Sequence, residues 1–313
     1  MTTCVIGGHG FIGRNVVDCL ISTGRDVLVL GRRLHRPVEL SLSAAYVPCD
    51  ISDRASLRRH LRGVNEIISL AHATTPKLGA SDLFADNVSN LQPALVLLEE
   101  AESLPDLRKL VVTSSGGTVY GVAAQMPISE TAPTAPVSPY GIVKLSIERY
   151  SLMSHLLRSL PVVIVRPANA YGVGQHPFMG QGFIATAIGH ILREEPISIF
   201  GNGQTIRDYI HVADVATGIL AALQMGANGE SYNIGTSVGR SNLEIIESLK
   251  GLAANEGRHV SIDLLPARGF DVPSNVLSYA KLHADTGWKP LENFEERLAE
   301  MWASMKKSLA SND

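Results

Sequence analysis

The chain has 313 residues, 45% of them apolar, which supplies a core and, at roughly 150 residues per domain, predicts about two domains. Lys and Arg (27) nearly balance Asp and Glu (30), and the formal net charge of -3 disfavours nucleic acid as a partner, because that partner requires a broad basic surface. The three cysteines lie in apolar patterns and no apolar run reaches the ~18 residues of a membrane span, so we expect free thiols, a cytoplasmic location and no membrane partner.

The first half of the sequence alternates short β-branched runs with longer amphipathic stretches. The runs expected to form strands cover residues 4–6, 27–30, 45–47, 66–70 and 110–113. The stretches expected to form helices cover residues 11–22 and 87–102. This alternation predicts an α/β fold with a Rossmann-type doubly wound parallel sheet, in which ligands bind beyond the carboxyl ends of the strands.

The second half begins with another helix and strand and then changes character. Ser138 and Pro139 predict a capped helix to about residue 159, and residues 160–167 predict a buried strand. Beyond Asn169 the sequence is irregular and glycine-rich through Gly203. We therefore expect two parts. Residues 1–168 and about 205–235 would form a dinucleotide-binding Rossmann domain. Residues about 169–204 and 236–313 would form a smaller C-terminal substrate-binding lobe.

Gly7, Gly10 and Gly13 stand between the first predicted strand and the first predicted helix. Bare backbone lets a diphosphate approach the unpaired amides at the helix N-terminus, where the helix dipole favours an anion. Glycines in this pattern can also serve a structural turn, so the motif alone is weak. Its place between strand and helix makes it a predicted dinucleotide site.

Residues 31–33 bear on the choice of cofactor. Gly31 ends the second predicted strand, where an acidic residue would hold the adenosine ribose 2′-hydroxyl, and Arg32 and Arg33 follow it. Since arginine can pair with a 2′-phosphate, we favour NADP over NAD. The alternative is that both arginines are solvated loop charges.

Tyr140 and Lys144 are four residues apart on the predicted helix, so their side chains share one face. An ammonium near a phenol favours the ionised phenol and lowers its pKa from about 10, as a nicotinamide ring nearby would also do. This spacing arises by chance on many helices. Together with the glycine turn and the alternating strands and helices, it predicts an acid/base site.

Further motifs are Ser-Ser-Gly-Gly-Thr-Val-Tyr-Gly at 114–121, Arg-Pro-Ala-Asn-Ala-Tyr-Gly at 166–172 and Arg-Asp-Tyr-Ile-His-Val-Ala-Asp at 207–214. With the glycine turn and the Tyr140/Lys144 pair, they make nearly the whole chain resemble the extended short-chain dehydrogenase/reductases, specifically the nucleotide-sugar epimerase/dehydratase family. The resemblance implies that Tyr140 is the acid/base and that Lys144 also binds the cofactor ribose.

The resemblance also implies an NAD(P) site at the carboxyl edge of the sheet. Asp50 and Ile51 would flank the adenine, and Pro167 would lie near the nicotinamide. The complete set of expected cofactor-binding residues is Gly7, Gly10, Phe11, Ile12, Gly13, Arg32, Arg33, Asp50, Ile51, Leu70, Ala71, Asn87, Ser114, Tyr140, Lys144 and Pro167.

The hydroxyl that assists the tyrosine in this family is missing from its usual register, which falls on Gly116. Because side chains alternate between faces at a strand end, Thr118 could present its hydroxyl from the same side. We expect Thr118 to take this catalytic role, with Ser115 as the alternative.

By the same resemblance, the second lobe holds a nucleotide-diphosphate sugar. Arg207 and Arg268 would clamp the diphosphate, since the arginine fork donates to two oxygens, although surface ion pairs are the alternative. Asp271 would bind the ribose, and Asn275 would lie beside the C2 substituent of the sugar. The expected substrate-binding residues are Thr118, Asn169, Gln181, Phe200, Arg207, Arg268, Asp271 and Asn275.

These expectations leave three functions open. The first is a 4-epimerase of carbohydrate biosynthesis that passes through a 4-keto sugar, with a UDP-hexose or a dTDP-6-deoxyhexose such as dTDP-rhamnose as substrate. The second is an NADPH-dependent 4-ketoreductase of a 4-keto-6-deoxy nucleotide sugar, and the third is a non-catalytic NADP-binding protein. A 4,6-dehydratase is disfavoured because residues 116–118 contain no carboxylate.

The resemblance further implies a homodimer, formed through a four-helix bundle that contains the helix at 87–102 and the helix after Tyr140. The histidines and cysteines lack the spacing of a zinc site, so we expect no metal.

Overall fold

The computed structural model describes residues 1–74, 82–267, 272–291 and 293–310. Its central sheet contains seven strands, all parallel, in the order β10-β6-β5-β4-β1-β2-β3. The strands are β1 (Thr2–Ile6), β2 (Asp26–Gly31), β3 (Ala45–Pro48), β4 (Glu66–Ser69), β5 (Lys109–Thr113), β6 (Val162–Pro167) and β10 (Ser231–Ile234). The expectation of a doubly wound Rossmann fold is confirmed.

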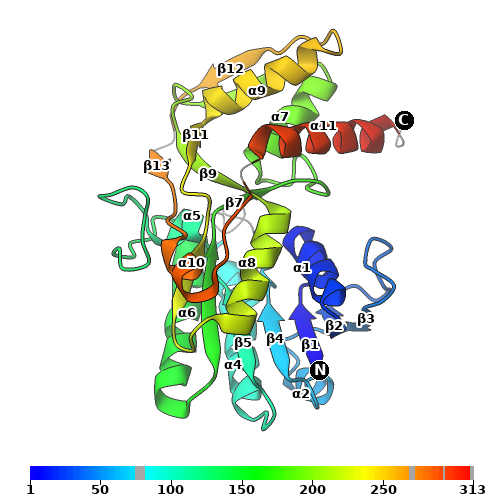
Figure 1. Ribbon diagram of the computed structural model, residues 1–313, viewed down its shortest axis with the longest axis vertical. Helices are drawn as coiled ribbons and strands as arrows, with labels where there is room; N and C mark the ends of the chain where they lie inside the picture. The colour runs from blue at the N-terminus through cyan, green and yellow to red at the C-terminus, as the bar shows by residue number, and fades with distance from the viewer. Residues whose placement is uncertain (75–81, 268–271, 292, 311–313) are drawn as a thin grey trace.

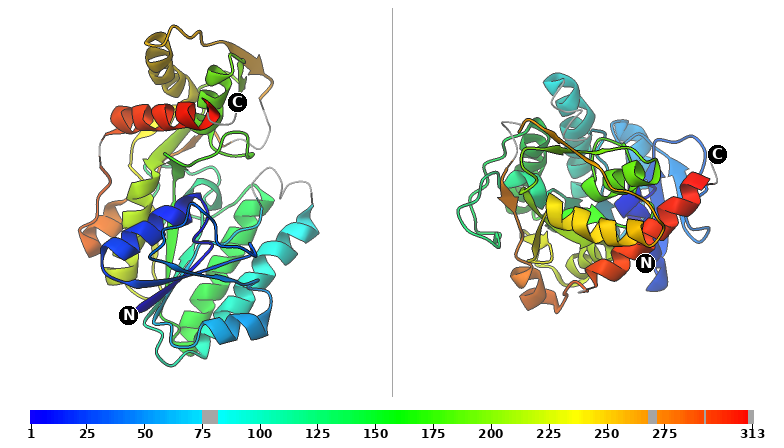
Figure 2. Two further views of the ribbon diagram at one scale, coloured as in Figure 1. Left: turned by 90° about the vertical axis from the view of Figure 1, so that its right-hand side faces the viewer. Right: turned by 90° about the horizontal axis from the view of Figure 1, so that it is seen from above.

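Helices cover both faces of this sheet (Figure 2). The helices on one face are α1 (Phe11–Ser22), α8 (Val212–Met225) and α10 (Ala280–Thr286). Those on the other face are α2 (Arg54–His60), α4 (Leu83–Glu102) and α6 (Pro139–Arg158). A single turn, α5 (Gly116–Val119), follows β5 and contacts α6. None of the helices in the described ranges is long and apolar enough to cross a membrane.

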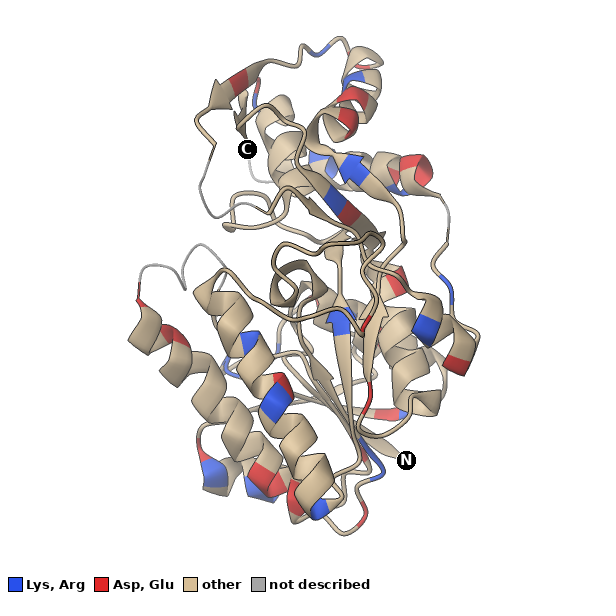
Figure 3. Ribbon diagram, turned by 90° about the vertical axis from the view of Figure 1, so that its left-hand side faces the viewer, with Lys and Arg blue, Asp and Glu red and all other residues tan. Residues whose placement is uncertain are grey.

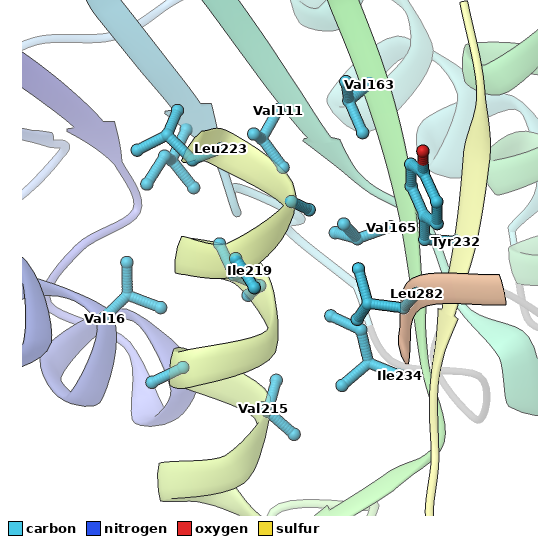
Figure 4. Packing of buried hydrophobic residues seen from close by; sticks show 14 of the residues in the cluster. Val16, Val111, Val163, Val165, Val215, Ile219, Leu223, Tyr232, Ile234 and Leu282 are labelled. Carbon is cyan, nitrogen blue, oxygen red and sulfur yellow. The ribbon is translucent and has the colours of Figure 1, made fainter. Parts of the chain in front are cut away.

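The core between α1, α8 and the sheet consists of aliphatic side chains in close contact (Figure 4). Helix α8 carries Val215 and Ile219, which are fully buried between Val16 of α1 and the sheet residues Val163 and Val165. Each fully buried side chain of this size contributes about 1.5–3 kcal/mol of transfer free energy. Packing of α8 therefore fixes the end of the sheet that carries β6 and β10.

A smaller lobe lies beyond the carboxyl ends of the central strands (Figure 1). Its sheet is centred on β9 (Ile206–His211), which pairs with β7 (Asn169–Tyr171), β11 (Gly239–Ser241) and β13 (Ser274–Asn275). Its remaining elements are α7 (Phe183–Leu192), β8 (Ile197–Phe200), α9 (Asn242–Ala254), β12 (Ile262–Leu265) and α11 (Phe294–Ala310).

The sheet pairing differs from the expected domain boundaries in two segments. Strand β9 belongs to the lobe, although residues 205–235 were expected in the Rossmann domain, because its hydrogen-bonded neighbours are the lobe strands. Helix α10 contacts α8 and β10 and therefore lies with the Rossmann domain, although it follows residue 236.

Candidate active site

The turn between β1 and α1 is built without room for side chains. Gly7 has φ +80°, and a Cβ on Gly13 would lie 2.4 Å from the Gly7 carbonyl oxygen. Gly10 is the N-cap of α1 and provides no side-chain cap, so no side chain occupies the first amides of this helix. Bare amides at the positive end of a helix fit a diphosphate, so this turn can hold the dinucleotide that the sequence predicts.

A cavity of about 280 Å³ lies over the start of α1. Arg14 bridges it, since its Nη2 donates to the carbonyl oxygen of Gly174, 3.0 Å away. The cavity is lined by His9, Gly10, Phe11, Arg14, Arg33, Glu39, Gly174, Gln175, His176, Met179 and Gln181. Gln181, expected at the substrate, thus shares this cavity with the expected cofactor residues Gly10, Phe11 and Arg33. Leu70 and Ala71 border the same turn, because a Cβ on Gly7 would lie 3.0 Å from the Ala71 nitrogen.

A side chain at the end of β2 would require the neighbouring His9 and Tyr46 side chains to move. A Cβ on Gly31 would lie 2.7 Å from Nδ1 of His9 and 3.1 Å from the Tyr46 hydroxyl. Arg32 and Arg33 are exposed directly after it, and their charges lower the pKa of His9 further than burial alone does. This corner is therefore cationic where a ribose-binding carboxylate is usual.

The adenine-side residues Asp50 and Ile51 follow β3. Asp50 is exposed, and its carboxylate accepts hydrogen bonds from the nitrogen and hydroxyl of Ser52 at 2.9 and 2.8 Å. These bonds, with a smaller contribution from Arg32, lower the pKa of Asp50. The Asp50 carboxylate is therefore close enough to Arg32 for their charges to interact.

Tyr140 and Lys144 occupy the first turns of α6, which Ser138 caps by accepting a hydrogen bond from the Gly141 nitrogen. Lys144 is buried, its Nζ donates to the carbonyl oxygen of Thr113 at 2.9 Å, and it lies 5.7 Å from the centre of the Tyr140 ring. Since Thr113 ends β5, the pair lies at the carboxyl edge of the sheet.

Burial shifts the pKa values of both members of this pair. Burial raises the pKa of Tyr140 to about 12, although a hydrogen bond with Ser115 opposes the rise. Burial also lowers the pKa of Lys144 to about 8. Desolvation of the phenolate thus opposes the lowering of the phenol pKa that the sequence predicts, and it outweighs the contribution of Ser115.

The hydroxyl beside Tyr140 belongs to Ser115. The expected first choice, Thr118, instead directs its hydroxyl to the Ser115 carbonyl oxygen, 3.4 Å away. A side chain at Gly116 has no space, since its Cβ would lie 2.2 Å from Cδ1 of Leu277 and 2.9 Å from the Arg166 carbonyl oxygen. The geometry therefore favours Ser115 over Thr118 and explains the missing residue at 116.

Two residues beside Tyr140 were missed in the sequence. The His72 ring lies edge to face with the Tyr140 ring, with centroids 4.6 Å apart, and Asp86 is buried on α4. The expected Asn87 is exposed and donates to the Leu83 carbonyl oxygen, so it points away from this site. Helical spacing carried the signal, since Asp86 and Asn90 share the buried face.

The remaining predicted residues stand at or next to the ends of strands in both parts of the chain. Asn169 begins β7 and donates to the Asp208 carbonyl oxygen at 3.3 Å, Arg207 lies on β9 and donates to the Ile206 carbonyl oxygen at 2.8 Å, and Phe200 ends β8. Pro167 ends β6, and the hydroxyl of Ser114 is buried after β5 with no partner among the described residues.

Asn275, which is expected beside the C2 substituent of the sugar, lies next to α5. It is buried, and its Nδ2 donates to the Gly116 carbonyl oxygen at 3.1 Å. Arg268 and Asp271 lie outside the described residues, so the expected diphosphate clamp has only Arg207 in the structure. No group of three or more candidate metal ligands is present in the described part of the chain.

The glycine turn, the parallel sheet and the Tyr140/Lys144 pair at its carboxyl edge define an enzyme of the extended short-chain dehydrogenase/reductase class. Residues 3–235 match the model of the NAD dependent epimerase/dehydratase family. A UDP-glucose 4-epimerase of Mycolicibacterium smegmatis is 33% identical over 308 residues, or 96% of each chain. The chain belongs to the NAD-dependent epimerase/dehydratase family, whose relatives act on nucleotide sugars.

Solved structures agree over the full chain. The UDP-glucose 4-epimerase of Thermotoga maritima with UDP-glucose has a TM-score of 0.91 and 32% identity, covering 99% of this chain and 100% of its own. The UDP-glucose 4-epimerase of Thermus thermophilus in complex with NAD has a TM-score of 0.88 and 28% identity, covering 98% and 99%. Because the relatives are enzymes, a non-catalytic role loses its support.

Proposed function

We propose that this protein is a nucleotide-sugar 4-epimerase with tightly bound NAD(P). The observation that carries the proposal is the position of Tyr140 beside the buried Lys144, whose Nζ lies 5.7 Å from the centre of the Tyr140 ring and donates to the Thr113 carbonyl oxygen at the carboxyl edge of the sheet. The relatives named UDP-glucose 4-epimerases favour a UDP-hexose as substrate, and a dTDP-6-deoxyhexose such as dTDP-rhamnose is the alternative.

In this reaction Tyr140 takes the proton of the sugar 4-hydroxyl and later returns it. Ser115 donates a hydrogen bond to the developing charge, and Lys144 provides a positive charge next to the phenolate. When bound, NAD(P) supplies the acceptor for the hydrogen at C4, which leaves a 4-keto sugar. Asn169, Gln181, Phe200 and Arg207 would hold the substrate while the keto sugar turns over.

Replacing Tyr140 tests the proposal. Tyr140→Phe should lower kcat about 10²–10⁴-fold, the range for loss of a general acid/base. Tyr150→Phe on the same helix is the control, because Tyr150 is exposed. NMR of the products formed from UDP-glucose and a panel of nucleotide sugars is the measurement. Undiminished turnover by Tyr140→Phe would refute the proposed chemistry.

For the cofactor, we propose a preference for NADP over NAD. Gly31 offers no carboxylate to the ribose 2′-hydroxyl, and the exposed Arg32 and Arg33 offer positive charge to a 2′-phosphate. Arg32→Ala and Arg33→Ala should weaken NADP binding and leave NAD binding unchanged, whereas Arg59→Ala on exposed α2 should change neither. Dissociation constants that favour NAD tenfold in the unaltered protein would contradict the preference.

The same arginine pair favours one second candidate, an NADPH-dependent 4-ketoreductase of a 4-keto-6-deoxy nucleotide sugar. A reductase consumes NADPH, so its absorbance would fall in step with product. An epimerase would convert the sugar without any net change in the cofactor. Following NADPH absorbance and sugar products in one reaction separates the two activities.

We further propose a homodimer through α4 and α6, which lie side by side at one edge of the molecule (Figure 3). Helix α4 has no charged residue between positions 87 and 98, and α6 exposes Tyr150, Met153, Leu156 and Leu157. Two such faces together would form a four-helix bundle. Light scattering should give twice the chain mass, and Met153→Glu should reduce it, whereas a monomeric mass for the unaltered protein would contradict this proposal.

A further inference from the structure

His72 follows β4 and packs directly on the residue proposed as acid/base. Its ring is tilted by 72° to the Tyr140 ring at a centroid distance of 4.6 Å. Burial and the nearby Lys144 lower the pKa of His72 to about 2, so the imidazole is neutral. The residue therefore adds an aromatic edge and no charge to the site.

A chain of hydrogen bonds joins His72 to a buried carboxylate. The Thr74 hydroxyl donates to Oδ1 of Asp86, and Nε2 of His72 lies 3.2 Å from the same hydroxyl oxygen. Asn90 donates from Nδ2 to Thr74 and to Oδ1 of Asp86, both at 3.0 Å, and accepts from the Ala73 nitrogen at 2.6 Å. Helix α4 thus fixes the loop that carries His72.

The chain of donors selects one tautomer. A threonine hydroxyl has one proton, and Thr74 gives it to Asp86, so the contact with His72 requires the proton on Nε2. Nδ1 is then a bare acceptor. It is buried and has no hydrogen-bond partner within the described ranges.

We infer that His72 is a positioning residue for Tyr140, held by Thr74 and Asp86 as the neutral, Nε2-protonated imidazole. The inference rests on the proposed function in taking Tyr140 as the acid/base. Ring packing restricts the orientation of the phenol, and the hydrogen-bonded chain prevents the imidazole from rotating or changing tautomer.

Asp86 has a second effect on Tyr140, because its negative charge raises the pKa of the phenol. The other groups that face this pair come from different elements. They are His72 after β4, Ser115 after β5 and Lys144 on α6, with the Glu148/Arg166 ion pair behind Lys144.

Heteronuclear NMR of the histidine ring nitrogens tests the tautomer without any substrate. We expect His72 to remain neutral with the proton on Nε2 from neutral to mildly acidic pH. Thr74→Val, which keeps the shape of threonine and removes the hydroxyl, should abolish this single tautomer, and Thr74→Ser should restore it. A proton on Nδ1, or protonation of His72 near pH 6, would overturn the inference.

Kinetics with UDP-glucose test the positioning role. Thr74→Val should lower kcat by up to about 100-fold with little change in KM, as when a reacting group is displaced by ~1 Å. Asp86→Asn keeps an acceptor for Thr74 and removes the charge. Because the Asp86 charge raises the pKa of the Tyr140 phenol, its removal should lower that pKa. In Asp86→Asn, the increase of kcat with pH that follows ionisation of the phenol should therefore occur at lower pH.

The two proposals fail differently. Full activity of Tyr140→Phe refutes the proposed function, whatever the tautomer of His72. Loss of activity in Tyr140→Phe, combined with unchanged kcat and pH profile in Thr74→Val and Asp86→Asn, refutes only the positioning role. If Asp86→Asn does not fold, His72→Ala replaces it, since alanine removes the ring contact with Tyr140, and an unchanged kcat there also refutes the role.

Discussion

Leu277 occupies the space that a side chain at position 116 would need. A Cβ on Gly116 would lie 2.2 Å from Cδ1 of this fully buried leucine. The leucine is held in turn by Asp208, whose carboxylate accepts from the Leu277 nitrogen at 3.1 Å. A residue from the C-terminal part thus determines what the catalytic turn can carry.

Gly116→Ser, which restores the family's usual hydroxyl, should therefore destabilise this protein. Overpacking of this kind costs about 1–3 kcal/mol, and Leu277→Ala alone costs about 2–5 kcal/mol through the cavity it leaves. The double variant should lose less free energy of unfolding than the two single variants lose together. Urea unfolding of the unaltered protein, the two single variants and the double variant is the measurement. Gly251→Ser is the control, because its Cβ meets no atom within 4 Å. Additive losses would contradict the contact.

Ser115→Ala should lower kcat more than Thr118→Val. Ser115 hydrogen-bonds to Tyr140, whereas Thr118 directs its hydroxyl to backbone. Loss of one donor to developing charge typically costs about 10²–10³-fold in kcat. Steady-state kinetics with UDP-glucose, with cofactor content measured for each variant, will rank the two hydroxyls. A larger loss for Thr118→Val would restore the expectation made from the sequence.

Arg166→Met should destabilise the protein strongly. The Arg166 guanidinium donates to Glu148 at 3.0 and 2.6 Å and to the Tyr120 hydroxyl at 2.8 Å, and all three side chains are buried. Breaking a buried pair leaves an uncompensated charge, at a cost of about 3–5 kcal/mol. Arg149→Met, at an exposed arginine of α6, should change the free energy of unfolding little. Similar losses for both variants would contradict this account.

The stability of the protein should fall as the pH drops from about 6.5 to about 4, partly through His211. Its Nδ1 faces two donors, the Ala213 nitrogen at 3.3 Å and Nη1 of Arg297 at 2.7 Å, and burial lowers its pKa to about 4. The unfolded chain binds this proton near pH 6.5 and the folded chain does not, so acid favours unfolding by roughly 2–3 kcal/mol.

His211→Gln should reduce this part of the pH dependence, because glutamine does not titrate. Urea unfolding of both proteins between pH 7 and 4 is the measurement. An equal slope in the two proteins would show that His211 is not responsible.

Capping residues visible in the sequence predicted where helices begin. Ser138 and Pro139 predicted the start of α6, and the structure begins that helix at Pro139 with Ser138 as its cap. Helix α4 begins at Leu83, ahead of the expected residue 87, because Asp82 accepts from the Ala85 nitrogen and serves as its N-cap. Asp82 is visible in the sequence as a capping residue, but the apolar pattern directly after it is weak, so the sequence predicted a later start for the helix.

Contacts between distant segments could not be predicted in the same way. The Leu277 side chain that excludes a residue at 116 comes from a segment with no motif, and only the fold brings the two together. Asn275 was placed at the sugar by its position, yet it is turned toward the Gly116 carbonyl oxygen. His72 belongs to no motif either, and its ring contact with Tyr140 and its hydrogen-bonded chain to Asp86 arise only in the folded chain. The roles of these site residues stay predictions.

The direct passage from β9 into α8 has a mechanical consequence. His211 is both the last residue of the lobe strand and the N-cap of the helix, so no loop separates the small sheet from the Rossmann core. Force applied to the small sheet is transmitted along the axis of α8 into the packing of Val215 and Ile219. This junction therefore contains no loop that could absorb a rotation of the small sheet relative to the Rossmann core.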